Sequence, residues 1–400
     1  MNSIHEHRIT EDIRSDIRDN GTRISDEKVV KLLKQRLLND DKYSDLSISE
    51  KIRISDTAFY RTRRDLSVLQ PIADDDAVSE IMVNGKDNVF IERNGKLEKV
   101  EISFESTDEL EEVIRRIAAK IHREINELSP ILDARLEDGS RVNAVYKNIA
   151  LEGPILTIRR FPKSRIGMKE LLAFETLSEE SALFLDKLVR SAYNIFISGG
   201  TSSGKTTFLN ALAGLIPKHE RIITIEDSAE LQITGIDNLV RLECRIANTQ
   251  ERGAVTMRQL IRTSLRMRPN RIIVGEVRGE EVLDMIQAMN TGHDGSLSTG
   301  HGNSPRGMLY RLEAMFLQAA DFPVAAIRRQ ITEGLDILVH LGRLPDGSRR
   351  VLEISEIAGM RNGEIELNRL YEYDSKIASL KSTGNTLIDK TKLEVKGIAL

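Results

Sequence analysis

A phosphate-loop pattern near the middle of the chain constrains its fold more than any other sequence feature. Residues 199–206 read GGTSSGKT, which fits G-x-x-x-x-G-K-[S/T]. The apolar run 193–197 precedes the loop, and the helix-like run 207–212 follows it. A strand, a glycine-rich loop and a helix in this order form an anion cradle, because backbone N–H groups and the positive end of the helix point at one place. The sequence therefore predicts a phosphate site.

The residues of this loop have separate expected tasks. Its glycines allow the backbone to curl with the N–H groups inward. Lys205 is expected to reach the β- and γ-phosphates of ATP, and the Thr206 hydroxyl is expected to hold Mg²⁺. The full set of residues expected to bind the nucleotide is Gly199, Gly200, Thr201, Ser202, Ser203, Gly204, Lys205, Thr206 and Thr207.

From about residue 168 the chain alternates between short apolar runs and helical runs. Strands are predicted at 195–197, 222–225, 239–242, 272–274 and 296–298, and helices at 256–267 and 280–290. Apolar strands between helices indicate a parallel sheet covered on both faces, and a phosphate loop at its carboxyl edge indicates a RecA-like domain. Residues 336–372 are expected to form hairpins, with turns at Asp346-Gly347 and Asn362-Gly363.

Residues 1–67 are highly charged and predict a small helical module. Ser47 and Glu50 have the spacing of a capping box that opens a helix. The apolar positions that recur along the expected helices are Val29, Val30, Leu33, Leu37, Ile52, Phe59 and Leu66. This module is expected to contact a partner or a neighbouring subunit rather than to carry chemistry.

Residues 68–162 change to strand patterning and predict an α+β domain with a helix on an antiparallel sheet. Hairpin turns are expected at Asn94-Gly95 and Asp138-Gly139. Ser106 and Glu109 form a second capping box, and 161–167 is the expected linker. The apolar face of the helix is expected at Leu110, Val113, Ile114, Ile117, Ala118, Ile121 and Ile125.

The predicted fold class is therefore α/β. A RecA-like P-loop NTPase domain over 163–372 follows the α+β domain over 68–162 and the helical module over 1–67. The tail at 373–400 is weakly patterned and receives no assignment.

Composition limits the class of protein. No run reaches the roughly 18 apolar residues that a membrane span needs, and the N-terminus lacks an apolar signal core, so a cytoplasmic location is expected. The net charge is −4 and aromatic residues make up 4%, which argues against nucleic acid as a constitutive partner. The single cysteine, Cys244, excludes an internal disulfide and a thiolate zinc site.

Carboxylates and histidines follow several predicted strands. Glu276 ends the apolar run 271–275 at the edge of the sheet where the phosphate loop lies, so it is the expected group for polarising the attacking water and a further candidate ligand of Mg²⁺. Glu226, with Asp227 and Glu230 near it, could share the metal. His293 and His301 flank a short predicted strand, and His301 is the candidate for sensing the γ-phosphate.

Four ordered motifs resemble those of the type II/type IV secretion ATPases. They are GGTSSGKTT, TIEDSAEL, RMRPNRIIVGEVRG and AMNTGHDGSLSTGHGNSP, which look like the Walker A, Asp-box, Walker B and His-box motifs of that superfamily. The runs ADDDAVSEIMVNG, SPILDARLEDGSRVNAV and GPILTIRRF are similar to the Tad/CpaF-type branch, which contains Flp pilus assembly ATPases. The resemblance extends over about residues 68–372.

The resemblance implies a hexameric motor that hydrolyses ATP. In such a motor a PAS-like, sensor-like N-terminal domain and a RecA-like domain clamp the nucleotide and drive pilus assembly or protein export. It implies inner-membrane platform proteins as partners and a peripheral location at the inner face of the cytoplasmic membrane. It also implies catalytic roles for Glu276, Glu226 and His301, and transition-state charge neutralisation by Arg135, Arg141 and Arg159.

Two other interpretations compete with this one. A RecA-like nucleic-acid translocase would use the basic run Arg262, Arg266 and Arg268, but the net acidity and scarce aromatics weigh against it. A nucleotide-gated scaffold without turnover is opposed by the intact Lys205, Thr206 and Glu276.

Overall fold

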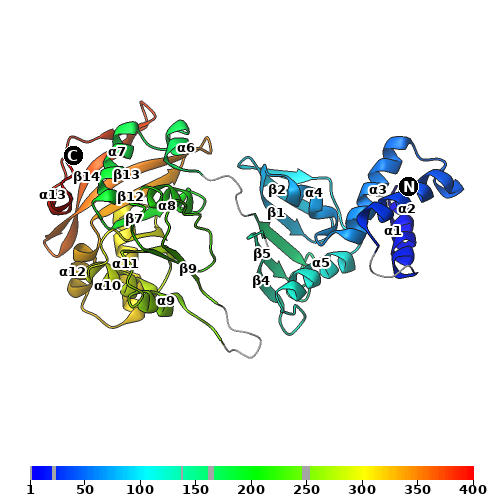
Figure 1. The fold of residues 1–400 in the computed structure, drawn as a ribbon, viewed down its shortest axis with the longest axis horizontal. Coiled ribbons are helices and arrows are strands. Elements are labelled where there is room, and N and C mark those ends of the chain that lie inside the picture. The colour runs from blue at the N-terminus through cyan, green and yellow to red at the C-terminus, as the bar shows by residue number, and fades with distance from the viewer. Residues whose placement is uncertain (1, 20–23, 137, 161–165, 246–252) are drawn as a thin grey trace. The chain divides into compact units, whose positions relative to one another are not determined.

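The structure is a computed structural model that describes residues 2–19, 24–136, 138–160, 166–245 and 253–400. The chain forms two compact units, Met1–Lys163 and Ser164–Leu400. Figure 1 shows both units. Most of the expected linker, residues 161–165, lies outside the described residues.

The first unit opens with a helical module. Its helices are α1 (Asn2–Asp19), α2 (Asp26–Asn39), the 3₁₀ turn η1 (Asp41–Tyr43) and α3 (Ile48–Arg63). The predicted capping box is confirmed, because Ser47 and Glu50 exchange side-chain and backbone bonds at the start of α3. Two expected positions of this helix are wrong. Ile52 is 58% exposed, and α3 buries Ile54 and Ala58 instead. Leu66 lies beyond α3, which ends at Arg63.

The rest of the first unit is an antiparallel sheet with a helix, as predicted. Its elements are η2 (Ser67–Leu69), α4 (Gln70–Asp74), β1 (Val78–Asn84), β2 (Asn88–Arg93), β3 (Lys96–Val100), α5 (Thr107–Lys120), β4 (Ile131–Arg135), β5 (Arg141–Val145) and β6 (Ile155–Arg159). The strand order is β3-β2-β1-β6-β5-β4. The hairpin turns at Asn94-Gly95, between β2 and β3, and at Asp138-Gly139, between β4 and β5, are confirmed.

Helix α5 differs from its prediction at both ends. It ends at Lys120, and His122 has a left-handed φ of 55°, so Ile121 and Ile125 lie beyond the helix. Only half of the predicted capping box forms, the bond from the Glu109 N–H to Ser106. The Glu109 carboxylate accepts hydrogen bonds from Ser67 and from the Glu105 N–H instead.

The second unit is built on one large sheet. Its strands are β7 (Ile195–Gly199), β8 (Ile222–Glu226), β9 (Leu239–Glu243), β10 (Arg271–Val277), β11 (Leu297–His301), β12 (Ile337–Arg343), β13 (Arg349–Arg361), β14 (Glu364–Asp374) and β15 (Ser379–Ser382). The order is β15-β14-β13-β12-β7-β11-β10-β8-β9. In this order, each strand from β12 to β9 pairs in parallel with its neighbour. Strands β13, β14 and β15 extend the other end of the sheet as antiparallel hairpins. The turns at Asp346-Gly347 and Asn362-Gly363 are confirmed.

Helices cover both faces of this sheet, as Figure 1 shows. They are α6 (Met168–Ala173), α7 (Glu179–Arg190), α8 (Lys205–Ala213), α9 (Met257–Ser264), α10 (Glu281–Asn290), α11 (Pro305–Ala319), α12 (Val324–Gly334) and α13 (Thr391–Lys396). Successive side chains of β7 lie on opposite faces of the sheet. Ile195 and Ile197 pack with α7 and α8 on one face, and Phe196 packs with α10 and α11 on the other. Because both faces are buried, β7 is apolar along its length rather than alternating.

Strand β11 is longer than predicted and begins one residue later. It runs to His301, three residues past the predicted end at Ser298. His301 is therefore part of the sheet and pairs in register with Gly199 of β7. The extension passes through Thr299 and Gly300, which sequence reasoning treated as loop, because pairing with β7 supplies backbone partners that a short sequence window does not reveal.

The C-terminal segment, which had no predicted structure, belongs to the second unit. Helix α13 places Lys392 at 2.7 Å from Asp336 and 2.8 Å from Asp294. Asp336 also accepts the Asn194 N–H at 2.6 Å. Burial raises the pKa of Asp336, and Lys392 offsets that effect. The ion pairs therefore fasten the tail to the start of β7 and β12.

We expect Lys392→Met to destabilise the second unit by about 3 kcal/mol, because it leaves a largely buried carboxylate without its cation. Urea unfolding followed by circular dichroism measures the change. Lys390→Met is the matched control, since Lys390 is exposed in the same segment. Equal stability of the two variants would contradict a structural role for the Lys392 ion pairs.

Candidate nucleotide-binding site

The phosphate loop connects β7 to α8 at the carboxyl edge of the parallel strands. Ser202 and Gly204 both have left-handed backbones, with φ of 57° and 93°. Gly199 is crowded: a Cβ there would lie 2.5 Å from the Ser203 hydroxyl and 2.6 Å from the Leu341 carbonyl. Nothing lies within 4 Å of the position that a Gly200 Cβ would take. The loop thus forms a cradle that is tight at its base and open at its rim.

The Lys205 ammonium lies inside this cradle. Its side chain is buried, and Nζ donates to the carbonyls of Gly199 at 3.2 Å and Gly200 at 2.9 Å. His301 Nδ1 lies 3.3 Å from the same nitrogen. Helix α8 begins at Lys205, so its first N–H groups and the ammonium converge on the same space.

Glu276 and His301 meet next to Lys205. His301 Nε2 lies 2.7 Å from Glu276 Oε1, while Glu276 Oε2 accepts hydrogen bonds from Arg278 at 2.7 and 3.0 Å. Arg278 also lies 3.5 Å from Asp227. Since Lys205 can only donate, His301 accepts at Nδ1 and carries its proton at Nε2. The neutral imidazole therefore lies between the cation and the carboxylate, and it contacts Glu276 Oε1 without a hydrogen bond to that oxygen.

The surroundings of His301 favour that neutral form. Burial lowers its pKa, the Glu276 carboxylate acts in the opposite direction, and the nearby Lys205 and Arg278 cations lower the pKa further. The net direction is downward from the ordinary value of about 6.5.

Glu226 ends β8 at the same edge of the sheet. It is 3% exposed, and its Oε2 accepts the N–H groups of Glu230 at 2.6 Å and Leu231 at 2.8 Å. Its Oε1 has no hydrogen-bond partner among the described residues. Burial raises the pKa of Glu226, and the two backbone donors counteract it. A Cβ on Gly275 would lie 3.0 Å from Glu226 Cγ, so Glu226 packs directly beside the strand that carries Glu276.

The three predicted arginines lie side by side in the first unit. In the sheet register Arg135 pairs with Arg141, and Arg141 pairs with Arg159. Directly opposed residues point to the same face, so the three side chains form a row across β4, β5 and β6. Like charges in such a row repel one another, which an anion would relieve. Arg159 is also 3.6 Å from Glu80, and Arg135 donates to the Gly139 carbonyl.

Comparison with known proteins identifies the family. Residues 62–369 match the sequence profile described as type II/IV secretion system protein. The chain belongs to this family. Conjugal transfer protein TrbB of Rhizobium radiobacter is 34% identical over 311 residues, which span 76% of this chain and 92% of TrbB. Type IV secretion system protein PtlH of Bordetella pertussis is 32% identical over 316 residues, spanning 72% of this chain and 93% of PtlH.

A solved ATPase structure agrees with the architecture. The X-ray structure of the ATPase DotB of Legionella pneumophila is similar over 71% of this chain and 78% of DotB, with a TM-score of 0.52 and 22% identity. The predicted fold class is therefore confirmed. No described helix of this family member is long and apolar enough to span a membrane.

The residues of the loop fit a nucleotide and its metal. The crowded Gly199, the left-handed Gly204 and the inward Lys205 make a cradle of the kind that suits a phosphate group. Within the described ranges no cluster of three or more His, Cys, Asp or Glu side chains could hold a metal ion. Mg²⁺ commonly binds one or two carboxylates together with substrate phosphates, so Thr206, Glu276 and the unpaired Glu226 Oε1 suit it.

Sequence reasoning missed several residues of this site. Arg278 stands in the motif GEVRG, two residues after Glu276, and that spacing was an available signal. His340 of β12 bonds the Ser198 hydroxyl at 2.9 Å, and burial lowers its pKa. Nothing in the local sequence marks His340, since only the sheet order brings it next to β7. His293 precedes β11 and therefore lies at the opposite edge from His301.

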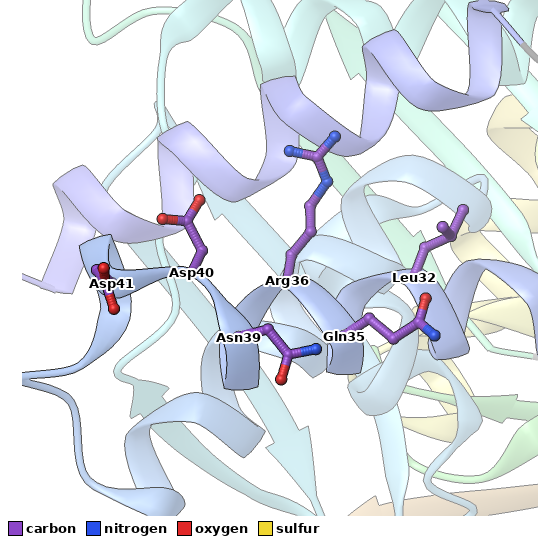
Figure 2. Close-up of a pocket in the computed structure, with 6 residues that line it drawn as sticks. All are labelled: Leu32, Gln35, Arg36, Asn39, Asp40 and Asp41. Carbon is purple, nitrogen blue, oxygen red and sulfur yellow. The ribbon is translucent and has the colours of Figure 1, made fainter.

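A separate depression of about 460 Å³ lies on the helical module of the first unit. Figure 2 shows the side chains that line it, which are Leu32, Gln35, Arg36, Asn39, Asp40 and Asp41. The Arg36 guanidinium in this depression already binds carboxylates, because it donates to Asp16 at 2.8 and 3.0 Å and lies 3.2 Å from Asp12. The depression contains none of the predicted site residues.

We expect His301 to titrate below pH 6.5, with the proton on Nε2 in its neutral form, because burial and the Lys205 cation disfavour imidazolium. NMR of histidine-labelled protein measures both properties, and a His301→Gln variant assigns the signal. Lys205→Ala should raise this pKa by removing the neighbouring cation. A His301 pKa at or above 6.5 in the unaltered protein would contradict the neutral imidazole.

Proposed function

We propose that this protein is an ATP-hydrolysing motor of a secretion or pilus machine. The observation that supports it best is the convergence of Lys205, His301 and Glu276 at the phosphate loop. Lys205 Nζ lies 3.3 Å from His301 Nδ1, and His301 Nε2 lies 2.7 Å from Glu276 Oε1. Phosphoryl transfer needs positioning and charge stabilisation rather than covalent chemistry, and these three groups supply both. Family membership supports the secretion role.

In this proposal Lys205 binds the β- and γ-phosphates and Glu276 orients the attacking water. His301 already contacts both groups, so it transmits the position of Lys205 to the carboxylate and senses the γ-phosphate. Glu226 and Thr206 would hold Mg²⁺, which when bound neutralises the charge of the phosphates. Arg278 holds Glu276 Oε2, which keeps Oε1 directed toward His301.

We further propose that Arg135, Arg141 and Arg159 neutralise the charge that develops on the transferring phosphoryl group. A planar, permanently charged guanidinium suits this task, and the in-register row brings three of them together. The row belongs to one compact unit and the phosphate loop to the other. The resemblance to the secretion ATPases further leads us to propose a ring, a homo-hexamer.

The resemblance of the motifs supports a narrower function. We propose the Tad/CpaF-type branch, partners among inner-membrane platform proteins, and peripheral attachment at the inner face of the cytoplasmic membrane. TrbB is a conjugal transfer protein and PtlH is a type IV secretion system protein, which supports a role in secretion or conjugal transfer in a broad sense. The nucleic-acid translocase loses support, because Arg262 of its basic run is paired with Asp284 at 2.6 Å.

Glu276→Gln should retain nucleotide binding and lose turnover by about 10²-fold or more, because the amide fills the same space without basicity. Phosphate release and nucleotide titration measure the two quantities. Glu276→Gln with bound ATP is also the sample for light scattering, which measures the mass of the assembly and would detect a ring. Wild-type turnover in Glu276→Gln would remove Glu276 as the water-orienting group, and a strict monomer would revive the scaffold interpretation.

Arg141→Ala and Arg159→Ala should each lower kcat by at least about tenfold while changing nucleotide affinity little, as expected of charges engaged in the transition state. Steady-state kinetics separates the two effects. Lys96→Ala is the control, since Lys96 is exposed on β3 at the other edge of the same sheet. Losses below about threefold in both arginine variants would indicate ordinary solvated charges.

A further inference from the structure

Arg349 reaches the phosphate loop from a distant part of the sequence. It is the first residue of β13, directly after the hairpin turn that follows β12. Its Nε donates to the Ser202 carbonyl at 3.0 Å. Its Cδ lies 3.2 Å from the place that a Gly204 Cβ would occupy. The hairpin between β12 and β13 therefore lies against the phosphate loop, beside Ser202 and Gly204, which both have left-handed backbones.

The strand order decides which end of a nucleotide this hairpin would face. Strand β10, which carries Glu276, lies two positions from β7 on one side, and β13 lies two positions from β7 on the other. Glu276 and His301 gather on the β10 side, where the terminal phosphate would react. A nucleotide seated with its γ-phosphate toward Glu276 extends its nucleoside toward β12 and β13.

The guanidinium of Arg349 has unused donors. Arg349 is exposed, and among the described residues its two terminal nitrogens have no hydrogen-bond partner and no carboxylate at ion-pair distance. A guanidinium fixed at Nε presents these nitrogens in a fork that matches phosphate oxygens. The contact to Ser202 thus fixes the stem of the side chain and leaves the head available.

We propose that Arg349 binds the α-phosphate of the nucleotide while it holds the tip of the phosphate loop. This inference rests on the proposed ATP site. It assigns a role to the β12–β13 hairpin, which the sequence motifs do not cover. The α-phosphate is common to ATP and ADP, so Arg349 contributes to the affinity for both and not to the chemical step.

Full-length Arg349→Ala and Arg349→Lys provide the test. Titration with a fluorescent ADP and with a non-hydrolysable ATP analogue should show Kd values raised about tenfold by Arg349→Ala for both ligands, with partial rescue by lysine. The kcat at saturating ATP should stay within about threefold of the unaltered value. Inorganic pyrophosphate, which competes for the loop but has no α-phosphate, should bind Arg349→Ala as it binds the unaltered chain.

Arg361→Ala is the matched control, because Arg361 is a 76% exposed arginine at the next hairpin, away from the loop. Unchanged ADP affinity in both Arg349 variants, with unchanged melting temperatures, would overturn the proposal. Pyrophosphate binding weakened as much as ADP binding would also overturn it, since Arg349 would then act only through the shape of the loop. Failure of the unaltered chain to bind ADP would instead remove the proposed nucleotide site itself.

Discussion

The close approach of parallel strands at Gly199 is the constraint on which the candidate site depends. Gly199 pairs in register with His301 of β11 and with Leu341 of β12. Its missing side chain admits the Ser203 hydroxyl and the Leu341 carbonyl, both of which a Cβ would meet below 3 Å. The same register brings His301 to the Lys205 ammonium. A one-residue slip of β11 would turn His301 to the other face of the sheet.

Electrostatic complementarity links the groups that this register collects. Donors and acceptors alternate along this group: Lys205 Nζ lies 3.3 Å from His301 Nδ1, His301 Nε2 lies 2.7 Å from Glu276 Oε1, and Arg278 donates to Glu276 Oε2. A neutral imidazole between an ammonium and a carboxylate needs less desolvation than a third ion would. Glu226 is held by backbone rather than by side chains: two N–H groups bond its Oε2, while its buried Oε1 accepts no hydrogen bond among the described residues.

Local sequence patterns predicted most helices and strands. They gave wrong side-chain contacts at positions where a distant segment competes with local partners. The hairpin turns formed as expected because the glycine of each Asn-Gly or Asp-Gly pair, together with Asn94 and Asn362, adopts a left-handed backbone. Glu109 had the spacing of a capping box, yet its carboxylate bonds Ser67, 42 residues away, and lies 3.3 Å from Arg61. Ile52 matched a helical period, but α3 turns another face toward its neighbours. Propensity and spacing describe a segment, whereas these outcomes depend on which other segment reaches it.

The sequence by itself determined the phosphate loop, the α/β class and the candidate carboxylates Glu226 and Glu276. Each of these depends on residues that are consecutive along the chain, so backbone chemistry and apolar patterning suffice. The tertiary structure alone decided that Arg135, Arg141 and Arg159 stand in one row, that the tail joins the second unit through Lys392, and that Arg349 touches a loop 147 residues away. Strand order and register create these contacts, and neither is encoded in any short window, because both follow from how many separate segments bury their apolar faces together.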